Sequence, residues 1–122
     1  MRNRLLSLLL LSLYGSMLFA QEPLDINDVE RVPLGDFTYQ WRNIYDRTPL
    51  HGKCRIILSY RSYTIAHFNK DGILDGLYEK YEDNHLVQKL TYVKGILRGK
   101  GYEYYTDGTV KKECVWNEQG KI

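Results

Sequence analysis

Three closely spaced glycines, Gly95, Gly99 and Gly101, form the first group of residues with a possible chemical role, because glycine-rich loops bind phosphate. A dinucleotide-binding loop needs Gly-x-Gly-x-x-Gly between a strand and a helix. Here the spacing is different, and no helical pattern follows. The glycines are therefore interpreted as turn positions, where a backbone with positive φ favours glycine.

The candidates for metal binding are residues 69–72 and the three histidines. If Gly72 stood at position 6 of a calcium loop, position 1 would be His67 and position 12 would be Tyr78, where oxygen ligands and a terminal glutamate are required. Neither His51, His67 nor His85 has cysteine or carboxylate partners at metal-ligand spacing. The sequence predicts no metal and no cofactor.

Acid–base catalysis would need two converging carboxylates, and Glu79 and Glu103 occupy equivalent positions of an internal repeat. Repetition by itself aligns such residues, so a solvated ladder with Lys80 nearby is the preferred interpretation. Ser59 and Ser62 have no neighbouring residues that would activate a nucleophile. We expect no catalytic residues and no enzyme activity.

The elements that carry these residues repeat with a period of about 24 residues. Each unit contains a β-rich segment, a turn such as Asp107-Gly108, and a returning segment with an aromatic residue near its end. Three series of equivalent positions define the period: Gly52, Gly76 and Gly99; Phe68, Tyr92 and Trp116; and Gly72, Gly95 and Gly120.

The repeat predicts an all-β fold, an elongated single-layer antiparallel meander of stacked β-hairpins over residues 37–122. The units are expected at about 49–72, 73–95 and 96–120, with a half-unit at 37–48 that begins with the alternating strand 37–42. Side chains alternate between the two faces of a strand. Residues at equivalent positions of the repeat are therefore expected to form one apolar layer on one face of the sheet, with His67, Thr91 and Val115 on the other face. The expected core residues of this apolar layer, besides Ala66, are Phe68, Leu90, Tyr92, Cys114 and Trp116.

Two cysteines in an exported chain usually suggest a disulfide, but the meander predicts otherwise. Cys54 and Cys114 would lie five strands apart, or about 24 Å at ~4.8 Å per strand. A disulfide needs Cα atoms within about 7 Å. We therefore expect two unpaired thiols, with Cys114 buried beside Trp116.

Residues 1–20 have the arrangement of a secretory signal peptide: Arg2 and Arg4, a short apolar run, and a small residue at Ala20. We expect cleavage after Ala20, and the alternative is that the segment is retained as a membrane anchor. Cleavage would export the protein to the periplasm or out of the cell. The cleaved protein is expected to have no membrane span. The chain has 17 basic and 15 acidic residues, and loss of the signal leaves 15 of each. This balance disfavours nucleic acid as a partner. Residues 21–36 are expected to form a flexible acidic lead-in.

Residues 47–122 resemble MORN-type repeats, in the variant form of bacterial secreted proteins. The resemblance rests on residues 76–81 and 101–105, which have a Gly-x-Tyr-like pattern, and on 92–95 and 116–120, where an aromatic precedes a glycine turn. The first unit departs from the pattern, since residues 52–57 lack both tyrosines. The resemblance implies an elongated sheet that binds proteins or lipids and brings no catalytic residues. Some such bacterial proteins are labelled antitoxins, which implies a cytoplasmic partner that the signal peptide argues against.

The tyrosines are the remaining candidates for a binding surface, because their rings combine an apolar body with a polar tip. Cross-strand packing is the alternative role for each of them. We expect a non-catalytic exported repeat module that binds a protein or an envelope component. The alternatives are a self-associating structural envelope protein and an antitoxin-like partner of a toxin protein, and the oligomeric state is left open. The candidate binding residues are Tyr78, Tyr81, Tyr102, Tyr104 and Tyr105.

Overall fold

The computed structural model describes residues 22–35 and 37–122, and these are almost entirely β-structure. The predicted signal peptide, residues 1–20, lies outside the described residues. The elements are β1 (Leu24–Asp25), the 3-10 helix η1 (Ile26–Asp28), β2 (Val29–Gly35), β3 (Thr38–Asn43), β4 (Gly52–Ser59), β5 (Ser62–Phe68), β6 (Leu74–Glu82), β7 (His85–Val93), β8 (Ile96–Leu97), β9 (Gly99–Tyr104) and β10 (Val110–Trp116).

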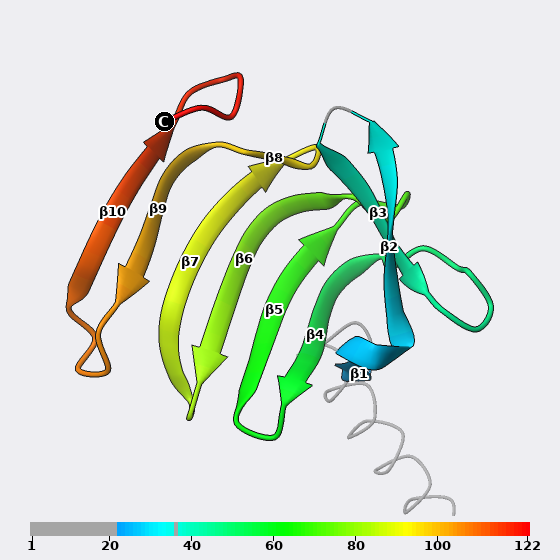
Figure 1. The fold of residues 1–122 in the computed structure, drawn as a ribbon, viewed down its shortest axis with the longest axis horizontal. Coiled ribbons are helices and arrows are strands. Elements are labelled where there is room, and N and C mark those ends of the chain that lie inside the picture. The colour runs from blue at the N-terminus through cyan, green and yellow to red at the C-terminus, as the bar shows by residue number, and fades with distance from the viewer. Residues whose placement is uncertain (1–21, 36) are drawn as a thin grey trace, which may run out of the picture.

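The main sheet is a curved meander in the order β1-β4-β5-β6-β7-β9-β10, with the short β8 paired to β7 (Figure 1). Every pair from β4 to β10 is antiparallel, and β1 adds a parallel edge strand beside β4. The expected all-β antiparallel meander of hairpins is confirmed. The residue types at the turns explain why the chain reverses direction between neighbouring strands. Asp83 and Asn84, for example, both adopt positive φ, 49° and 63°, in the tight turn between β6 and β7.

Of the glycines interpreted as turn positions, Gly95 and Gly99 have positive φ, but Gly101 lies inside β9 without it, so the interpretation is wrong for Gly101. Gly72, Gly95 and Gly120 have φ of 75°, 87° and 77°, a region that side chains rarely adopt. The loops that begin at Asn69 and Asn117 share one hydrogen-bond pattern, in which the asparagine side-chain oxygen accepts two backbone N–H groups of its own loop. The glycines thus serve the backbone geometry of the loops.

The first predicted strand leaves the meander. β3 pairs with β2 in a separate two-stranded sheet, which lies across one face of the main sheet near β4, β5 and β6 (Figure 1). The predicted half-unit 37–48 is therefore wrong, and so is a single layer throughout. The expectation of a flexible lead-in over 21–36 is also wrong, since residues 24–35 form β1, η1 and β2. The sheet face covered by the β2–β3 hairpin is called the inner face below, and the opposite one the outer face.

Burial of Trp41 explains why the hairpin lies there. The Trp41 side chain is only 9% exposed, and its ring centroid lies 5.5 Å from that of Phe68. The Trp41 backbone N–H donates to the Gly72 carbonyl at 2.7 Å, and its own carbonyl accepts the Leu50 N–H at 2.9 Å. Large aromatic side chains contribute strongly to cores, so covering the apolar start of the main sheet is more favourable than extending its edge.

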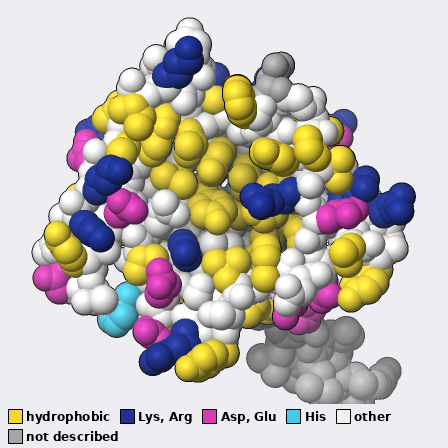
Figure 2. All heavy atoms as spheres, viewed as in Figure 1, with side chains coloured by type: hydrophobic (Ala, Val, Ile, Leu, Met, Phe, Trp, Pro, Cys, Tyr) yellow, Lys and Arg dark blue, Asp and Glu magenta, His cyan; other side chains and the backbone are white. Residues whose placement is uncertain are grey.

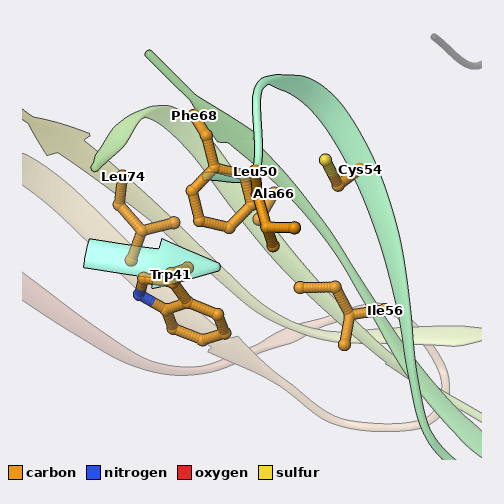
Figure 3. Packing of buried hydrophobic residues seen from close by; sticks show 7 residues of the cluster. All are labelled: Trp41, Leu50, Cys54, Ile56, Ala66, Phe68 and Leu74. Atoms are coloured by element: carbon orange, nitrogen blue, oxygen red, sulfur yellow. The ribbon is translucent and has the colours of Figure 1, made fainter. Parts of the chain in front are cut away.

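The core is confined to the covered half of the inner face (Figure 3). The expected core residue Phe68 is buried, at 4% exposed. The expected core residues Leu90, Cys114 and Trp116 are only half-buried, and Tyr92 is a half-buried neighbour of the cluster. They lie where none of the described elements forms a second layer on the sheet, so the prediction of a continuous buried layer is wrong. The buried hydrophobic residues are Trp41, Leu50, Cys54, Ile56, Ala66, Phe68 and Leu74.

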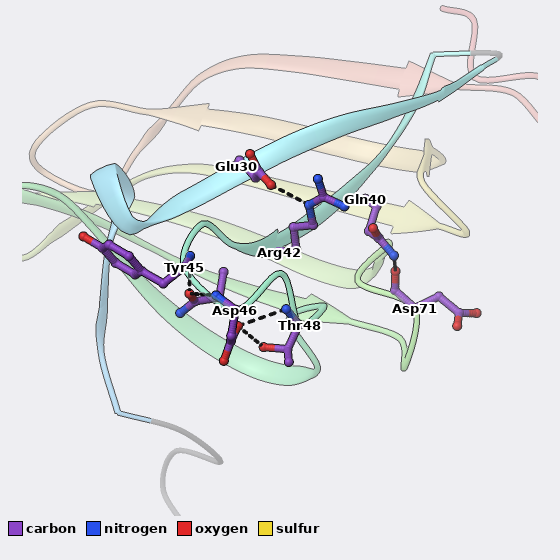
Figure 4. Close-up of polar contacts among 8 residues, drawn as sticks. Glu30, Gln40, Arg42, Tyr45, Asp46, Thr48 and Asp71 are labelled. Carbon is purple, nitrogen blue, oxygen red and sulfur yellow. Dashed lines mark hydrogen bonds and ion pairs between the residues drawn. The ribbon is translucent and has the colours of Figure 1, made fainter.

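Polar contacts fix the hairpin from its other side (Figure 4). Arg42 on β3 makes an ion pair with Glu30 on β2, and the Gln40 amide donates to the Asp71 carbonyl in the β5–β6 loop at 3.0 Å. In the following loop the Asp46 carboxylate accepts from both the N–H and the hydroxyl of Thr48. These hydrogen bonds lower the pKa of Asp46 because they favour its charged form.

Candidate functional site

The uncovered half of the inner face carries an apolar surface formed by β7, β9 and β10. Cys114 stands opposite Gly101 in the ladder, and Trp116 lies on the same face two residues further along β10. A Cβ on Gly101 would come within 2.4 Å of the Trp116 ring and 2.8 Å of Leu90. The indole therefore lies directly over the Gly101 backbone, beside Leu90. A hollow of about 210 Å³ opens here, lined by these residues and Leu97.

A larger cleft lies between this surface and the overhanging hairpin, with a volume of about 360 Å³. Figure 2 shows hydrophobic side chains gathered around a hollow in the middle of the molecule, with lysine and arginine side chains beside them. Leu97 lines both the cleft and the smaller hollow, so the two are neighbours. The cleft is lined by Arg31, Phe37, Tyr39, Trp41, Leu74, Tyr92, Gly95, Ile96, Leu97, Gln119 and Gly120.

The hairpin supplies the polar group of this cleft. Arg31 pairs with Trp41 across the β2–β3 ladder, so both side chains point to the same face of the hairpin. The Arg31 guanidinium carbon lies 5.4 Å from the Trp41 ring centroid and 5.8 Å from that of Tyr39. Contacts of this length are cation–π interactions. They hold a positive charge at the opening of an apolar cleft.

Two tyrosines stand beside the cleft. Tyr78 on β6 and Tyr92 on β7 make an edge-to-face contact with ring centroids 6.0 Å apart. Burial raises the pKa of both hydroxyls, because it disfavours the phenolate. For Tyr78 the positive charge of Arg31 partly offsets this rise. The field of Arg31 therefore reaches the inner face of the main sheet.

The five tyrosines predicted as one binding surface do not lie together. Tyr78 is on the inner face, whereas Tyr81, three residues later, points to the outer face and stacks on Tyr63 with centroids 4.9 Å apart. Tyr102 and Tyr104 also point outward, because Tyr102 pairs with Lys89 and Glu113 on the face opposite Gly101. Their rings lie 6.0 Å apart.

Tyr105 follows β9 and is 53% exposed, with Lys111 at 6.0 Å from its ring centroid. The outer face also has a cation–π contact that sequence reasoning did not identify, in which Arg55 lies 4.2 Å from the Tyr63 ring centroid. This contact joins the Tyr63–Tyr81 stack to the strand β4. The outer tyrosines thus contact one another or a basic side chain, as the cross-strand alternative expects.

The carboxylate pair considered for acid–base chemistry does not exist. Glu79 stands opposite Lys89 on the outer face, whereas Glu103 stands between Gln88 and Lys112 on the inner face. The expectation that the two glutamates line up is wrong, because Glu103 pairs with Gln88, the partner of Lys80, and not with Lys89, the partner of Glu79. Among residues 22–35 and 37–122, no three His, Cys, Asp or Glu side chains cluster in a way that would hold a metal.

The two cysteines are unpaired, as predicted. Cys54 on β4 is fully buried, and Cys114 on β10 is half-buried. Four strands separate β4 from β10 in the sheet order, which confirms the geometric reason against a disulfide. Burial raises the pKa of the Cys54 thiol.

The residues that sequence reasoning missed come from the hairpin: Arg31, Phe37 and Tyr39. The alternation of residues 37–42 identified a strand, but periodicity gives no information about which sheet a strand joins. Arg31 lay in the segment expected to be irregular. No alternation marked this segment, because residues 29–32 read Val-Glu-Arg-Val.

No protein-family model matches the chain, and comparison with curated proteins gives no significant match. Within residues 22–35 and 37–122, no helix has the length and apolar character needed to cross a membrane.

Proposed function

We propose that this protein is a non-catalytic exported module, resembling a MORN-type repeat protein, that acts by binding a protein or an envelope component through its inner face. The predicted signal peptide supports export. The balance of charge in the chain after residue 20 supports a partner other than nucleic acid. Glu79 and Glu103, the carboxylate pair considered for acid–base chemistry, lie on opposite faces of the sheet.

One observation carries the proposal: the inner face is covered over β4–β6 and open over β7–β10. Leu90, Leu97 and Trp116 form an apolar surface there that no other described element covers. Contiguous apolar surface with polar residues around it marks binding sites in soluble domains. The hollow beside Trp116 and the cleft beside the hairpin give this surface the concave shape that binding sites favour.

A matched pair of variants on β7 tests the face. Leu90 points to the inner face and the next residue, Thr91, to the outer one, and both are half-buried. Purified wild-type protein, Leu90→Lys and Thr91→Lys would each be used for affinity capture from envelope extract, followed by mass spectrometry. Each captured component would then be purified and titrated against the three proteins.

We expect a component that binds the wild type and Thr91→Lys equally and binds Leu90→Lys at least tenfold more weakly. Thermal unfolding of both variants serves as the folding control. If Leu90→Lys bound the component as tightly as the wild type does, the inner face would not be the binding surface. Absence of any captured component in replicate extracts would contradict the binding function itself.

The alternative of self-association is supported by the edge strand β10. Among the described residues β10 pairs with β9 alone, so its other edge has unpaired backbone groups. Such an edge is a template for another strand. Light scattering across a hundredfold range of concentration distinguishes the two functions: a monomer throughout supports the binding module, and a dimer or larger species supports the structural protein.

A further inference from the structure

The charged group of the cleft has no acidic partner among the residues that the structure describes. No carboxylate in residues 22–35 and 37–122 makes an ion pair with Arg31, and no described acceptor takes a hydrogen bond from its side chain. The other hairpin arginine, Arg42, has Glu30 as its partner. Arg31 therefore keeps its N–H donors available while ring contacts with Tyr39 and Trp41 hold it in place.

The guanidinium favours an anion that offers two oxygens side by side. It is planar and presents its donors in a fork that fits the two oxygens of a carboxylate. Because Arg31 is already held against two rings, it loses little side-chain freedom when a ligand binds. The cleft is thus prepared for a single carboxylate at its opening.

The apolar walls of the cleft favour a ligand with an apolar body. Phe37, which is 96% exposed, and Tyr39, which is 43% exposed, face Tyr92, Ile96 and Leu97 across it. Phe37 also adopts φ of 65°, an unfavourable region for a bulky residue, and such strain is concentrated at binding sites. A ligand with an apolar body would bury these exposed rings.

The size of the cleft selects a small molecule. Its volume of about 360 Å³ falls within the range of about 300–1,000 Å³ that is typical of small-molecule pockets. Gln119 and Gly120 also line the cleft, and Leu97 separates it from the hollow beside Trp116.

We propose that this cleft binds a small organic acid, with its carboxylate on Arg31 and its aryl or alkyl body against Phe37, Tyr39, Tyr92 and Leu97. The proposal rests on the proposed binding function and names a ligand class for the hairpin end of the inner face. No bond forms or breaks in the process.

The test uses two ligands that differ only in charge, 4-phenylbutyrate and 4-phenylbutan-1-ol. The chain has two tryptophans, so a Trp116→Phe background leaves Trp41, which lines the cleft, as the single fluorescent reporter. Titration by fluorescence, checked by calorimetry on the wild type, gives both affinities. We expect the acid to bind at least about tenfold more tightly than the alcohol, as a charge-assisted hydrogen bond contributes.

Two variants locate the charge. Arg31→Gln should reduce the affinity for the acid about tenfold or more and leave that for the alcohol unchanged. The control is Arg61→Gln, because Arg61 also contacts an aromatic ring, Tyr60 at 5.7 Å, but lies outside the cleft. That variant should bind the acid as the wild type does.

Equal binding of acid and alcohol, or unchanged acid binding by Arg31→Gln, would overturn the proposal. So would binding of a peptide with a C-terminal phenylalanine but not of 4-phenylbutyrate, because the ligand would then be a polypeptide terminus. Failure of these titrations alongside loss of partner capture by Leu90→Lys would refute the organic-acid site alone and leave the proposed function standing.

Discussion

The contrast between the two tryptophans gives the sharpest test of how this fold is stabilised. Trp41 joins the hairpin to the sheet and is 9% exposed, whereas Trp116 is half-buried on the uncovered part of the same face. We expect Trp41→Ala to lower the free energy of unfolding by about 3–5 kcal/mol, the range for a large aromatic truncated in a core. Loss of the ring contact with Phe68 is included in that range.

Trp116→Ala should cost less, about 1–2 kcal/mol, which is an ordinary value for a substitution outside the core. Its ring contacts Gly101 and Leu90 on one side only, so its removal opens the hollow to water and leaves no closed cavity. This expectation replaces the one from sequence, in which Trp116 stood in a continuous core.

Urea unfolding followed by far-ultraviolet circular dichroism measures both variants without relying on tryptophan emission. With an m-value of about 2 kcal/mol/M, Trp41→Ala should lower the midpoint by about 2 M and Trp116→Ala by under 1 M. Trp41→Phe is the conservative control and should recover part of the loss. Equal shifts for the two alanine variants, or a larger one for Trp116→Ala, would show that the hairpin does not form the core described above.

Four further predictions concern other parts of the chain. Gly101→Ala should destabilise the protein by about 1–3 kcal/mol, because its methyl group would overlap the Trp116 ring, and the double variant with Trp116→Leu should regain stability in the same urea assay. Titration of the unreduced native protein with a thiol reagent should detect Cys114 quickly and Cys54 only after unfolding, with two thiols in total; a single early phase for both would contradict the burial of Cys54. Because burial raises the pKa of Cys54, the folded state keeps that proton at a pH where the unfolded chain loses it, so stability should fall as the pH rises above about 8.5, and less so in Cys54→Ala. Intact-mass measurement of the protein from its native host should show a chain that begins after Ala20; a mass that includes residues 1–20 would indicate an anchor instead.

Local sequence patterns determined the strands and turns of this protein. Residues 37–42 alternate between apolar and polar types as an extended chain requires, and Asp83-Asn84 supplies a tight turn in which both residues adopt positive φ. The glycines at 72, 95 and 120 were predicted as turn residues for the same reason, since positive φ is a requirement of the local backbone. The unpaired cysteines followed from strand order, which short hairpins fix.

The alternation of side chains along a strand also indicates which sheet face each tyrosine points to, and the prediction of the site did not use this. Tyr78 and Tyr81 are three residues apart on one strand, so alternation alone places them on opposite faces. The prediction grouped the tyrosines by type, and the structure separates them by position. The same holds for Glu79 and Glu103, because Glu79 is three residues after Gly76 and Glu103 is four residues after the equivalent Gly99.

Only the tertiary structure decided what covers the sheet. The alternation in residues 37–42 is satisfied equally by a strand added to the sheet edge and by a strand laid across its face, because both bury one side of the strand. The difference is made by contacts between distant residues: Trp41 on Phe68, and the Trp41 backbone on Gly72. Those contacts bury the inner face over β4–β6 and leave Leu90, Cys114 and Trp116 half-exposed. The cleft with Arg31 exists for the same reason, because it forms where the hairpin ends and the sheet continues.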